Sequence, residues 1–382
     1  MERFDVERLK EDNPVEDVIA RYVHLRRRGR TLVGLCPFHK EKDPSFTVWP
    51  GGGWYCFGCN EGGDVISFVM AMENVDFPEA CRILGGGSLP ELTTPPPKVE
   101  VPVETVELGR TERQALGLAQ RVYHARLWSL PTDHPARQYL AQRKIDPDMI
   151  RRFGLGWCSG QDLIPALQFL RMDRQVFLDT GLLGEKAGRL QEFLRERIVI
   201  PERDPRGMVL HMVGRAIDDR GLRYLSLPGL PKPLYGLSSI QRQKPVVVVE
   251  GIFCRFSLER CGVQSVAIMG TALRRQASAL KTIPDLTFVP QNDEVDDRGP
   301  TAKEWLEEAE HNPTASRWLE GIVETSGDAA LLTKGQAAVI KWLLEVEHGQ
   351  IIELPRDMKD VNDLDQAGGL EAWLDSWAHW RA

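Results

Sequence analysis

The chain has no run of 18 apolar residues, and its first residues, MERFDVERLKED, carry too many charges for a secretory signal. A membrane span and export are therefore not expected, and we predict a cytoplasmic protein without a membrane partner. The chain also lacks an excess of basic residues, since its formal net charge is −7. That charge argues against a protein coated by nucleic acid, so any contact with nucleic acid should be local.

Two further features that the sequence lacks exclude other classes of protein. The seven cysteines are an odd number, which favours reduced thiols over a disulfide framework. No Gly-Lys-Ser or Gly-Lys-Thr phosphate loop occurs, which excludes a fused P-loop helicase. What the chain does have is 382 residues, 42% of them hydrophobic, enough for two or three domains with full cores.

Four potential metal ligands fall into two spaced pairs. Cys36 and His39 form a C-x2-H pair, and Cys56 and Cys59 form a C-x2-C pair. Three thiolates and one imidazole make the ligand set of a closed tetrahedral zinc site, which leaves no position for water. Strand-like segments on both sides of the glycine turn at 51–53 predict a small β-ribbon. We therefore predict a zinc ion that stabilises structure and does not catalyse.

An arginine-rich segment leads into these pairs and includes Arg26, Arg27, Arg28 and Arg30. In an otherwise acidic protein it predicts a local phosphate-binding patch, and the alternative is an ordinary solvated face. Aromatic residues 49, 54 and 55 would stack on unpaired bases if exposed, whereas the alternative is that they form the core of the ribbon.

These residues carry a resemblance to a known family. The strings CPFH-KEKDPSF, W-Y-CFGC and GGDVISFVM resemble the zinc-binding domain of bacterial DnaG-type primases, over about residues 5–85. Similar fingers occur in phage and plasmid primases. FLRERIVIPERDPRGMVLHMVGRAIDD and RYLSLPGLPKPLYGL resemble the catalytic core of the same primases. The resemblance implies that four basic residues bind template or nucleotide: Arg197, Arg215, Arg223 (where lysine is usual) and Lys232.

A valine run, 246–249, ends in Glu250-Gly251 and predicts a buried parallel strand with an acid at its carboxyl end. With the strand near 265–269 and its Gly-Thr turn, it resembles a Toprim domain, whose acids bind Mg²⁺. The resemblance implies Glu250, Asp293 and Asp360 as acids for Mg²⁺ or Mn²⁺. Helix capping is the alternative role for Asp360 and Asp363.

The match departs from the family after the third strand, where an Asp-x-Asp-x-x-Gly motif is expected. Gln291 stands in place of the first Asp, and Cys254 replaces another acid, four residues after Glu250. Counting back from Gly299 gives a second register, so further candidate acids are Glu294 and Asp296, with Asp363 in the last acidic motif. A thiol is a poor Mg²⁺ ligand, because hard cations bind oxygen.

The predicted fold class is α+β multidomain: a small zinc-ribbon domain followed by an α+β primase core that contains an α/β Toprim domain. The predicted boundaries are 1–88 for the zinc domain, 89–108 for a Pro-rich linker, 109–243 for the N-terminal part of the core, 244–366 for the Toprim domain with a helical insertion near 300–349, and 367–382 for a C-terminal helix. The helical bundle and helicase-binding domain of long primases are not expected.

The predicted function is a primase that joins ribonucleoside triphosphates on single-stranded DNA, with a replicative helicase as a further partner. The alternative is a replication accessory protein that binds single strands without catalysis, because two Toprim acids are replaced. A Toprim nuclease or topoisomerase is disfavoured, since no domain with a nucleophilic tyrosine is evident.

Overall fold

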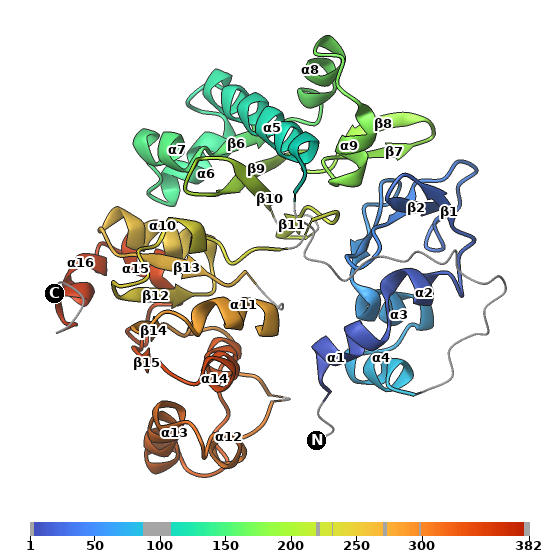
Figure 1. The fold of residues 1–382 in the computed structure, drawn as a ribbon. Helices are drawn as coiled ribbons and strands as arrows, with labels where there is room; N and C mark the ends of the chain where they lie inside the picture. Colours follow the sequence, from blue (N-terminus) through green and yellow to red (C-terminus); the bar gives the residue numbers. More distant parts are fainter. Residues whose placement is uncertain are drawn as a thin grey trace. The chain divides into compact units, whose positions relative to one another are not determined.

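The computed structural model describes residues 4–86, 108–218, 222–230, 232–269, 273–297 and 299–377. The chain divides into two compact units (Figure 1). The first unit comprises Glu2–Gln138 and Ile150–Lys232, and the second comprises Tyr139–Met149 and Pro233–Ala382. The predicted linker 89–108, except its last residue, and the predicted Gly-Thr turn lie outside the described residues. No helix within the described ranges is long and apolar enough to cross a membrane.

The N-terminal part of the first unit is a five-stranded antiparallel sheet with four short helices. Its strands follow one another in the order β1-β2-β3-β4-β5, as in a meander. The elements are α1 (Val6–Asp12), α2 (Val15–Ile19), β1 (Arg26–Arg28), β2 (Thr31–Gly34), β3 (Phe46–Val48), β4 (Trp54–Cys56), β5 (Gly62–Gly63), α3 (Val65–Glu73) and α4 (Phe77–Leu84). The predicted ribbon is therefore confirmed, because β3 and β4 flank the glycine turn.

The three aromatic residues proposed to stack on bases are not exposed. Trp49, Trp54 and Tyr55 keep only 2%, 4% and 7% of their surface accessible, so of the two alternatives, burial in a core is confirmed and stacking on bases is not. Trp54 stacks on Phe46 with ring centroids 5.2 Å apart, inside the core of the ribbon. Burial of such large apolar rings stabilises a small domain more than exposure would.

The remainder of the first unit surrounds a four-stranded antiparallel sheet ordered β11-β10-β9-β6, with β7 and β8 as a separate hairpin. Strands β9 and β10 form an antiparallel hairpin in which Val213 faces Ile200. The elements are α5 (Arg110–Ser129), α6 (Pro135–Gln142), α7 (Pro147–Phe153), β6 (Gly156–Cys158), α8 (Leu163–Phe169), α9 (Arg174–Asp179), β7 (Leu183–Lys186), β8 (Arg189–Glu192), β9 (Arg197–Arg203), β10 (Val209–Ala216) and β11 (Tyr224–Ser226). The end of α6 and the start of α7 fall within Tyr139–Met149 and so belong to the second unit.

The second unit is built on a parallel sheet with the strand order β13-β12-β14-β15. The predicted valine strand is confirmed as β12, whose four residues are all buried. Helix α10 lies on one side of the sheet in Figure 1, and α11 and α14 lie on the other. The elements are η1 (Leu237–Ser239), β12 (Val246–Val249), α10 (Ile252–Arg260), β13 (Ser265–Ala267), α11 (Leu273–Leu280), β14 (Leu286–Phe288), α12 (Ala302–Glu308), α13 (Pro313–Ser326), α14 (Lys334–Val346), β15 (Gln350–Ile351), α15 (Val361–Gln366) and α16 (Leu370–Asp375).

The strand order determines where a ligand can bind. The chain leaves β12 in one direction, toward β13, and then crosses back to place β14 on the other side of β12. In open parallel sheets, ligands bind outside the carboxyl ends of the strands at this reversal. Glu250 follows β12, and residues 291–293 lie shortly after β14, so both flank the reversal.

The predicted helices of residues 300–349 are confirmed as α12, α13 and α14, which share one hydrophobic core with the parallel sheet. The C-terminal helix predicted within residues 367–382 is α16, which spans Leu370–Asp375. Residues 378–382 lie outside the described part of the chain.

Candidate functional site

The two predicted ligand pairs come together at one end of the ribbon. The four donor atoms of Cys36, His39, Cys56 and Cys59 all lie within 4.8 Å of one another. The Cys36 and Cys59 sulfurs are 3.9 Å apart, and Cys56 Sγ lies 3.8 Å from His39 Nδ1. A zinc ion with Zn–S bonds of about 2.3 Å needs tetrahedral edges of about 3.7 Å, so this donor set fits zinc.

Polar neighbours orient these donors. His39 Nε2 lies 3.1 Å from a carboxylate oxygen of Glu41, which leaves Nδ1 facing the sulfurs. Glu41 also accepts hydrogen bonds from the backbone N–H groups of Cys36 and Ser45. Hydrogen bonding from the Cys36 thiol, together with the Ser45 hydroxyl, lowers the pKa of Cys56 to about 5. The arrangement favours a thiolate at Cys56 and a fixed imidazole tautomer, as metal sites require.

The acids of the second unit gather at the sheet reversal. The Glu250 side chain is exposed over much of its surface, yet packing around its carboxyl group raises the pKa. The carboxylates of Asp293 and Asp360 raise it further, while Lys359 opposes them. The structure therefore brings together three predicted acids from three separate segments. Carboxylate oxygens fit Mg²⁺ or Mn²⁺, which keep several waters when only a few carboxylates bind.

Asp360 also caps a helix, as the alternative interpretation predicted. Its Oδ1 accepts a hydrogen bond from the backbone N–H of Asp363, 2.9 Å away, at the start of α15. Cys254 lies beside this cap, where burial and the Asp360 carboxylate hold the pKa of its thiol well above the ordinary value. Asp363 lies one turn further along α15, and its pKa is raised by burial and by Asp360.

The two replaced acids are neighbours in space. A Cβ on Gly251 would lie 3.3 Å from Cys254 Sγ and 3.6 Å from Gln291 Nε2, so thiol and amide face the same turn. Glu294 is instead exposed and pairs with Lys334 at 3.1 Å. Asp296 donates its backbone N–H to Leu332 O, 2.8 Å away. Of the acids in this loop, Asp293 is the one that raises the pKa of Glu250.

Sequence reasoning missed the residue that links the two acidic segments. Asn292 Nδ2 donates to Pro355 O at 3.0 Å and to Met358 O at 2.9 Å, and its backbone N–H donates to Lys359 O. These bonds tie the loop that carries Asp293 to the loop that precedes Asp360. The sequence contains no signal for this role, because an asparagine between acids is typical of any loop.

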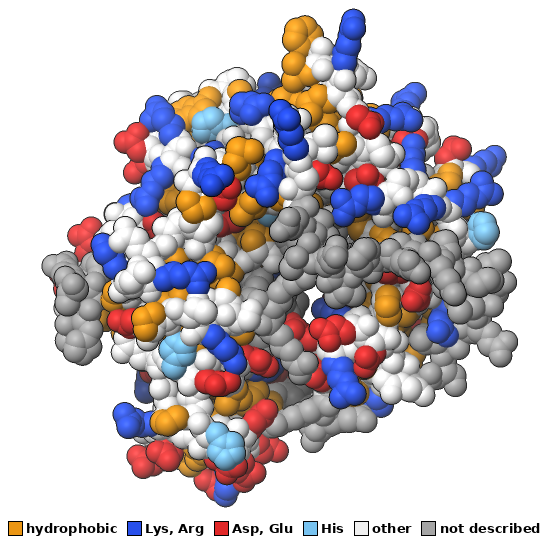
Figure 2. All heavy atoms as spheres, in the orientation of Figure 1, with side chains coloured by type: hydrophobic (Ala, Val, Ile, Leu, Met, Phe, Trp, Pro, Cys, Tyr) orange, Lys and Arg blue, Asp and Glu red, His pale blue; other side chains and the backbone are white. Residues whose placement is uncertain are grey.

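Basic residues cluster at one end of the antiparallel sheet in the first unit. Arg197 begins β9, and its pKa is lowered by burial and by the nearby Arg215 and Arg195. The Arg215 guanidinium lies 4.7 Å from the centre of the Tyr224 ring, on the neighbouring strand. Arg223 is exposed beside it. Figure 2 shows many further Lys and Arg side chains over α5, α7 and α8.

Lys232 is the most perturbed of the predicted basic residues. Burial lowers its pKa to about 8, and Lys10 contributes to the same direction. Burial lowers the pKa of His211 to about 3, and the positive charge of Lys232 lowers it further, so the two side chains lie close together.

The arginines before the ribbon divide into two groups. Arg28 forms an ion pair with Glu185, and Arg30 Nη1 lies 3.6 Å from Glu112 Oε1, so both are engaged inside the first unit. Arg26 and Arg27 are exposed on β1. Arg30 also keeps 46% of its side-chain surface exposed, so the predicted phosphate-binding patch has three exposed arginines, one of them in an ion pair.

Comparisons with known families match both parts of the first unit. Residues 1–88 match the CHC2 zinc finger, and residues 122–231 match the N-terminal domain of the DNA primase catalytic core. The four clustered ligands and the basic sheet end fall inside these two matches.

Whole-chain comparisons lead to the same proteins. A DNA primase of Pseudomonas putida is 32% identical over 306 residues, which are 74% of this chain and 45% of that protein. A DNA primase of Clostridium acetobutylicum is 31% identical, with 72% and 48% covered. The chain thus spans about half the length of the curated relatives it matches. The crystal structure of the zinc-binding and RNA polymerase domains of Aquifex aeolicus primase aligns with a TM-score of 0.52 at 25% identity, over 98% of this chain and 86% of that one.

Proposed function

Because this chain belongs to the bacterial DnaG-type DNA primase family, we propose that it synthesises short RNA primers on single-stranded DNA by metal-dependent nucleotidyl transfer. The observation that carries the proposal is the meeting of Glu250, Asp293 and Asp360 at the sheet reversal. Family membership favours this enzyme over the non-catalytic accessory protein.

In this proposal the three acids hold Mg²⁺ or Mn²⁺ through their carboxylate oxygens. A bound divalent cation would stabilise the attacking 3′-oxygen and the charge that develops on pyrophosphate. Glu250 directly follows β12 at the reversal, and Asn292 holds the loops of the two other acids together. Cys254 supplies no oxygen ligand and Gln291 supplies no negative charge, so the carboxylate ligands of the cation would come from the remaining three acids.

The zinc ion belongs to the CHC2 finger and is structural in this proposal, with Cys36, His39, Cys56 and Cys59 as its ligands. The proposed domains are the zinc domain at 1–88, the linker at 89–108, the N-terminal part of the core at 109–243, the Toprim domain at 244–366 and the C-terminal helix at 367–382. A role in replication would place the protein in the cytoplasm.

Template and nucleotides would bind through basic side chains. Arg197, Arg215 and Arg223 form one cluster, and Lys232 and the exposed Arg26 and Arg27 complete the proposed contacts. Solved relatives include the DnaG primase catalytic domain bound to single-stranded DNA. Ribonucleoside triphosphates are the proposed substrates, and a replicative helicase is a proposed partner.

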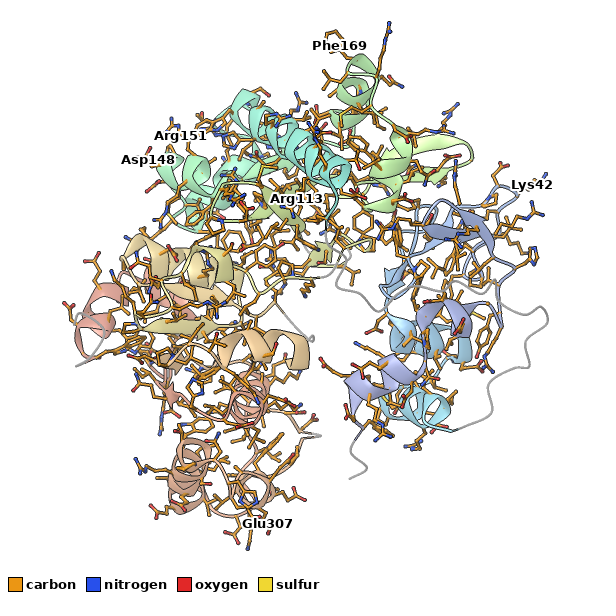
Figure 3. The ribbon with its side chains drawn as sticks, viewed as in Figure 1. Lys42, Arg113, Asp148, Arg151, Phe169 and Glu307 are labelled. Carbon is orange, nitrogen blue, oxygen red and sulfur yellow. The ribbon has the colours of Figure 1, made fainter. Side chains whose placement is uncertain are left out.

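The test is synthesis of labelled RNA on a defined single-stranded template, in Mg²⁺ and separately in Mn²⁺. Glu250→Gln removes one charge without changing size, so we expect product to disappear while zinc content and circular dichroism stay the same. Glu307→Gln is the matched control, because Glu307 projects from the outer part of α12 (Figure 3). Undiminished synthesis by Glu250→Gln would overturn the assignment, and template binding without product in the unmodified protein would favour the accessory protein.

A further inference from the structure

The loop that follows β14 is held by a segment far along the chain. The backbone N–H of Gly335 donates to Asp293 Oδ1 at 2.9 Å, across 42 positions. Thr333 Oγ1 donates to Gln291 O at 2.9 Å, and the backbone N–H of Lys334 donates to Glu294 O at 3.1 Å. Three consecutive residues at the start of α14 therefore each donate a hydrogen bond to the acidic loop.

Gly335 allows this contact because it has no side chain. A Cβ at this position would lie 2.6 Å from Gln291 O and 2.7 Å from Gln291 N, closer than real Cβ atoms approach backbone. The start of α14 is fixed independently by a capping box, in which the Thr333 and Gln336 side chains satisfy each other's backbone N–H. The helix and the acidic loop therefore keep one mutual position.

We propose that Gly335 positions Asp293, and that residues 294–333, with helices α12 and α13, are an insertion that separates the acidic loop from its glycine. The proposal rests on the proposed function, since it concerns the acids of that site. Gly299, three residues after Asp296, does not take this role. The nearest atoms to a Cβ there belong to the Asp296 side chain, whereas a Cβ at Gly335 would meet the backbone of Gln291, three residues after the end of β14.

The geometry explains why such a contact matters for a cation. One oxygen of Asp293 is occupied by the N–H of Gly335, which leaves Oδ2 for a ligand. The donor lies in the first turn of α14, a helix of 13 residues, so a regular element holds Asp293 in place. A fixed carboxylate compensates in part for the acids that Gln291 and Cys254 replace.

The composition of α12 and α13 argues against a DNA-binding role for the insertion. Over residues 301–330, seven acids outnumber two bases, Lys303 and Arg317. The acids are Glu304, Glu307, Glu308, Glu310, Glu320, Glu324 and Asp328. Acidic side chains also gather over this end of the molecule in Figure 2. Such a surface would repel a phosphate backbone, so the contribution of the insertion to the site is the placement of α14.

The test compares two Gly→Ala variants of the full chain. Gly335→Ala drives a methyl group into the backbone of Gln291, whereas Gly321→Ala, in the same insertion, adds one to open space. Mn²⁺ affinity is measured by electron paramagnetic resonance of the free ion, and folding by circular dichroism. Outer-shell changes weaken metal binding by about 10–100-fold, so we expect at least about tenfold for Gly335→Ala and no change for Gly321→Ala.

A double-variant cycle separates positioning from general damage. If Gly335 acts through Asp293, adding Gly335→Ala to Asp293→Asn weakens Mn²⁺ binding no further than Asp293→Asn alone. If Gly335→Ala fails to fold, variants of Thr333 test the positioning of the acidic loop instead. Thr333→Val removes the hydroxyl that donates to Gln291 O and should weaken Mn²⁺ binding, while Thr333→Ser should restore it.

The outcomes keep the two proposals apart. Unchanged Mn²⁺ affinity in Gly335→Ala, with Glu250→Gln still inactive, would overturn the positioning role alone. Loss of fold in Gly335→Ala with wild-type Mn²⁺ affinity in Thr333→Val would do the same. An unmodified protein that binds no Mn²⁺ and makes no primer would overturn the proposed function itself.

Discussion

Replacing Asn292 with alanine should loosen the joint between the two acidic loops of the second unit. The side chain donates two hydrogen bonds, of 3.0 Å to Pro355 O and 2.9 Å to Met358 O. Each contributes about 1 kcal/mol net, and a partly buried carbonyl left without a donor adds about 1 kcal/mol or more. We expect the free energy of unfolding of the second unit to fall by about 2–3 kcal/mol, with the backbone bond to Lys359 retained.

Hydrogen exchange measured by mass spectrometry is the suitable assay, because a chain with two units need not unfold in a single transition. Peptides covering 286–297 and 350–360 should exchange faster in Asn292→Ala, while peptides of the first unit should not change. A loss below about 0.5 kcal/mol, the range of ordinary surface substitutions, would refute the reasoning.

Asn292→Asp is the sharper companion variant. An ionised carboxylate donates no hydrogen bond and adds a further negative charge near Glu250 and Asp293. Those neighbours should raise the pKa of the new carboxyl group in the folded state, so the protonated form is favoured there. Its contribution to stability is then present at low pH and lost as the pH rises. Asn292→Asp should therefore lose more stability at pH 8 than at pH 5, whereas Asn292→Ala should lose the same at both.

Two further predictions concern the first unit. Removal of zinc with a chelator should expose the backbone amides of β3 and β4 to hydrogen exchange, and Cys59→Ser should have the same effect. Protection of these amides that persists without metal would contradict a structural zinc.

Lys232 has a pKa of about 8 instead of 10.5, so it should lose its charge between pH 7 and 9. Binding of single-stranded DNA should therefore weaken over that range, and Lys232→Arg should make the binding less dependent on pH. Between about pH 8 and 10.5 the unfolded chain binds a proton at Lys232 that the folded chain does not, so this residue should make the unfolding free energy rise with pH there, an increase absent from Lys232→Met.

The parts of the fold that the sequence predicts well are those with local causes. Ligands two residues apart reach one ion from a single turn, so the zinc cluster follows from spacing alone. Four consecutive valines are buried on both faces only in a covered parallel sheet, and β12 has that environment.

Burial of the aromatic residues could not be predicted in the same way, because it depends on distant partners. Trp49, Tyr55 and Phe57 all pack against Phe193, at ring distances of 6.3, 4.9 and 6.0 Å. Phe193 directly follows β8 in a part of the chain that no local pattern connects to the ribbon. A tryptophan in a zinc ribbon is therefore compatible with base stacking or with a core until its partner is known.

The acidic motif shows a different limit of prediction from sequence. The number of residues between the acids and the glycine of a motif is preserved only where the chain tolerates no insertion. Glu294 O and Lys334 N meet at 3.1 Å, and antiparallel bridges join Val295 to Thr333 and Thr301 to Leu331. An insertion whose ends already meet leaves both flanks in place, and each doubling of loop length adds only about 0.6 kcal/mol of closure entropy. Helices α12 and α13 offset that entropy by burying apolar residues in the common core. A register counted back from Gly299 therefore relies on the glycine that is nearest in sequence. A register counted from the end of β14 instead identifies the acids that can reach the sheet reversal. Asp293 as a cation ligand stays a prediction, and Gly335 is the residue whose substitution tests it most directly.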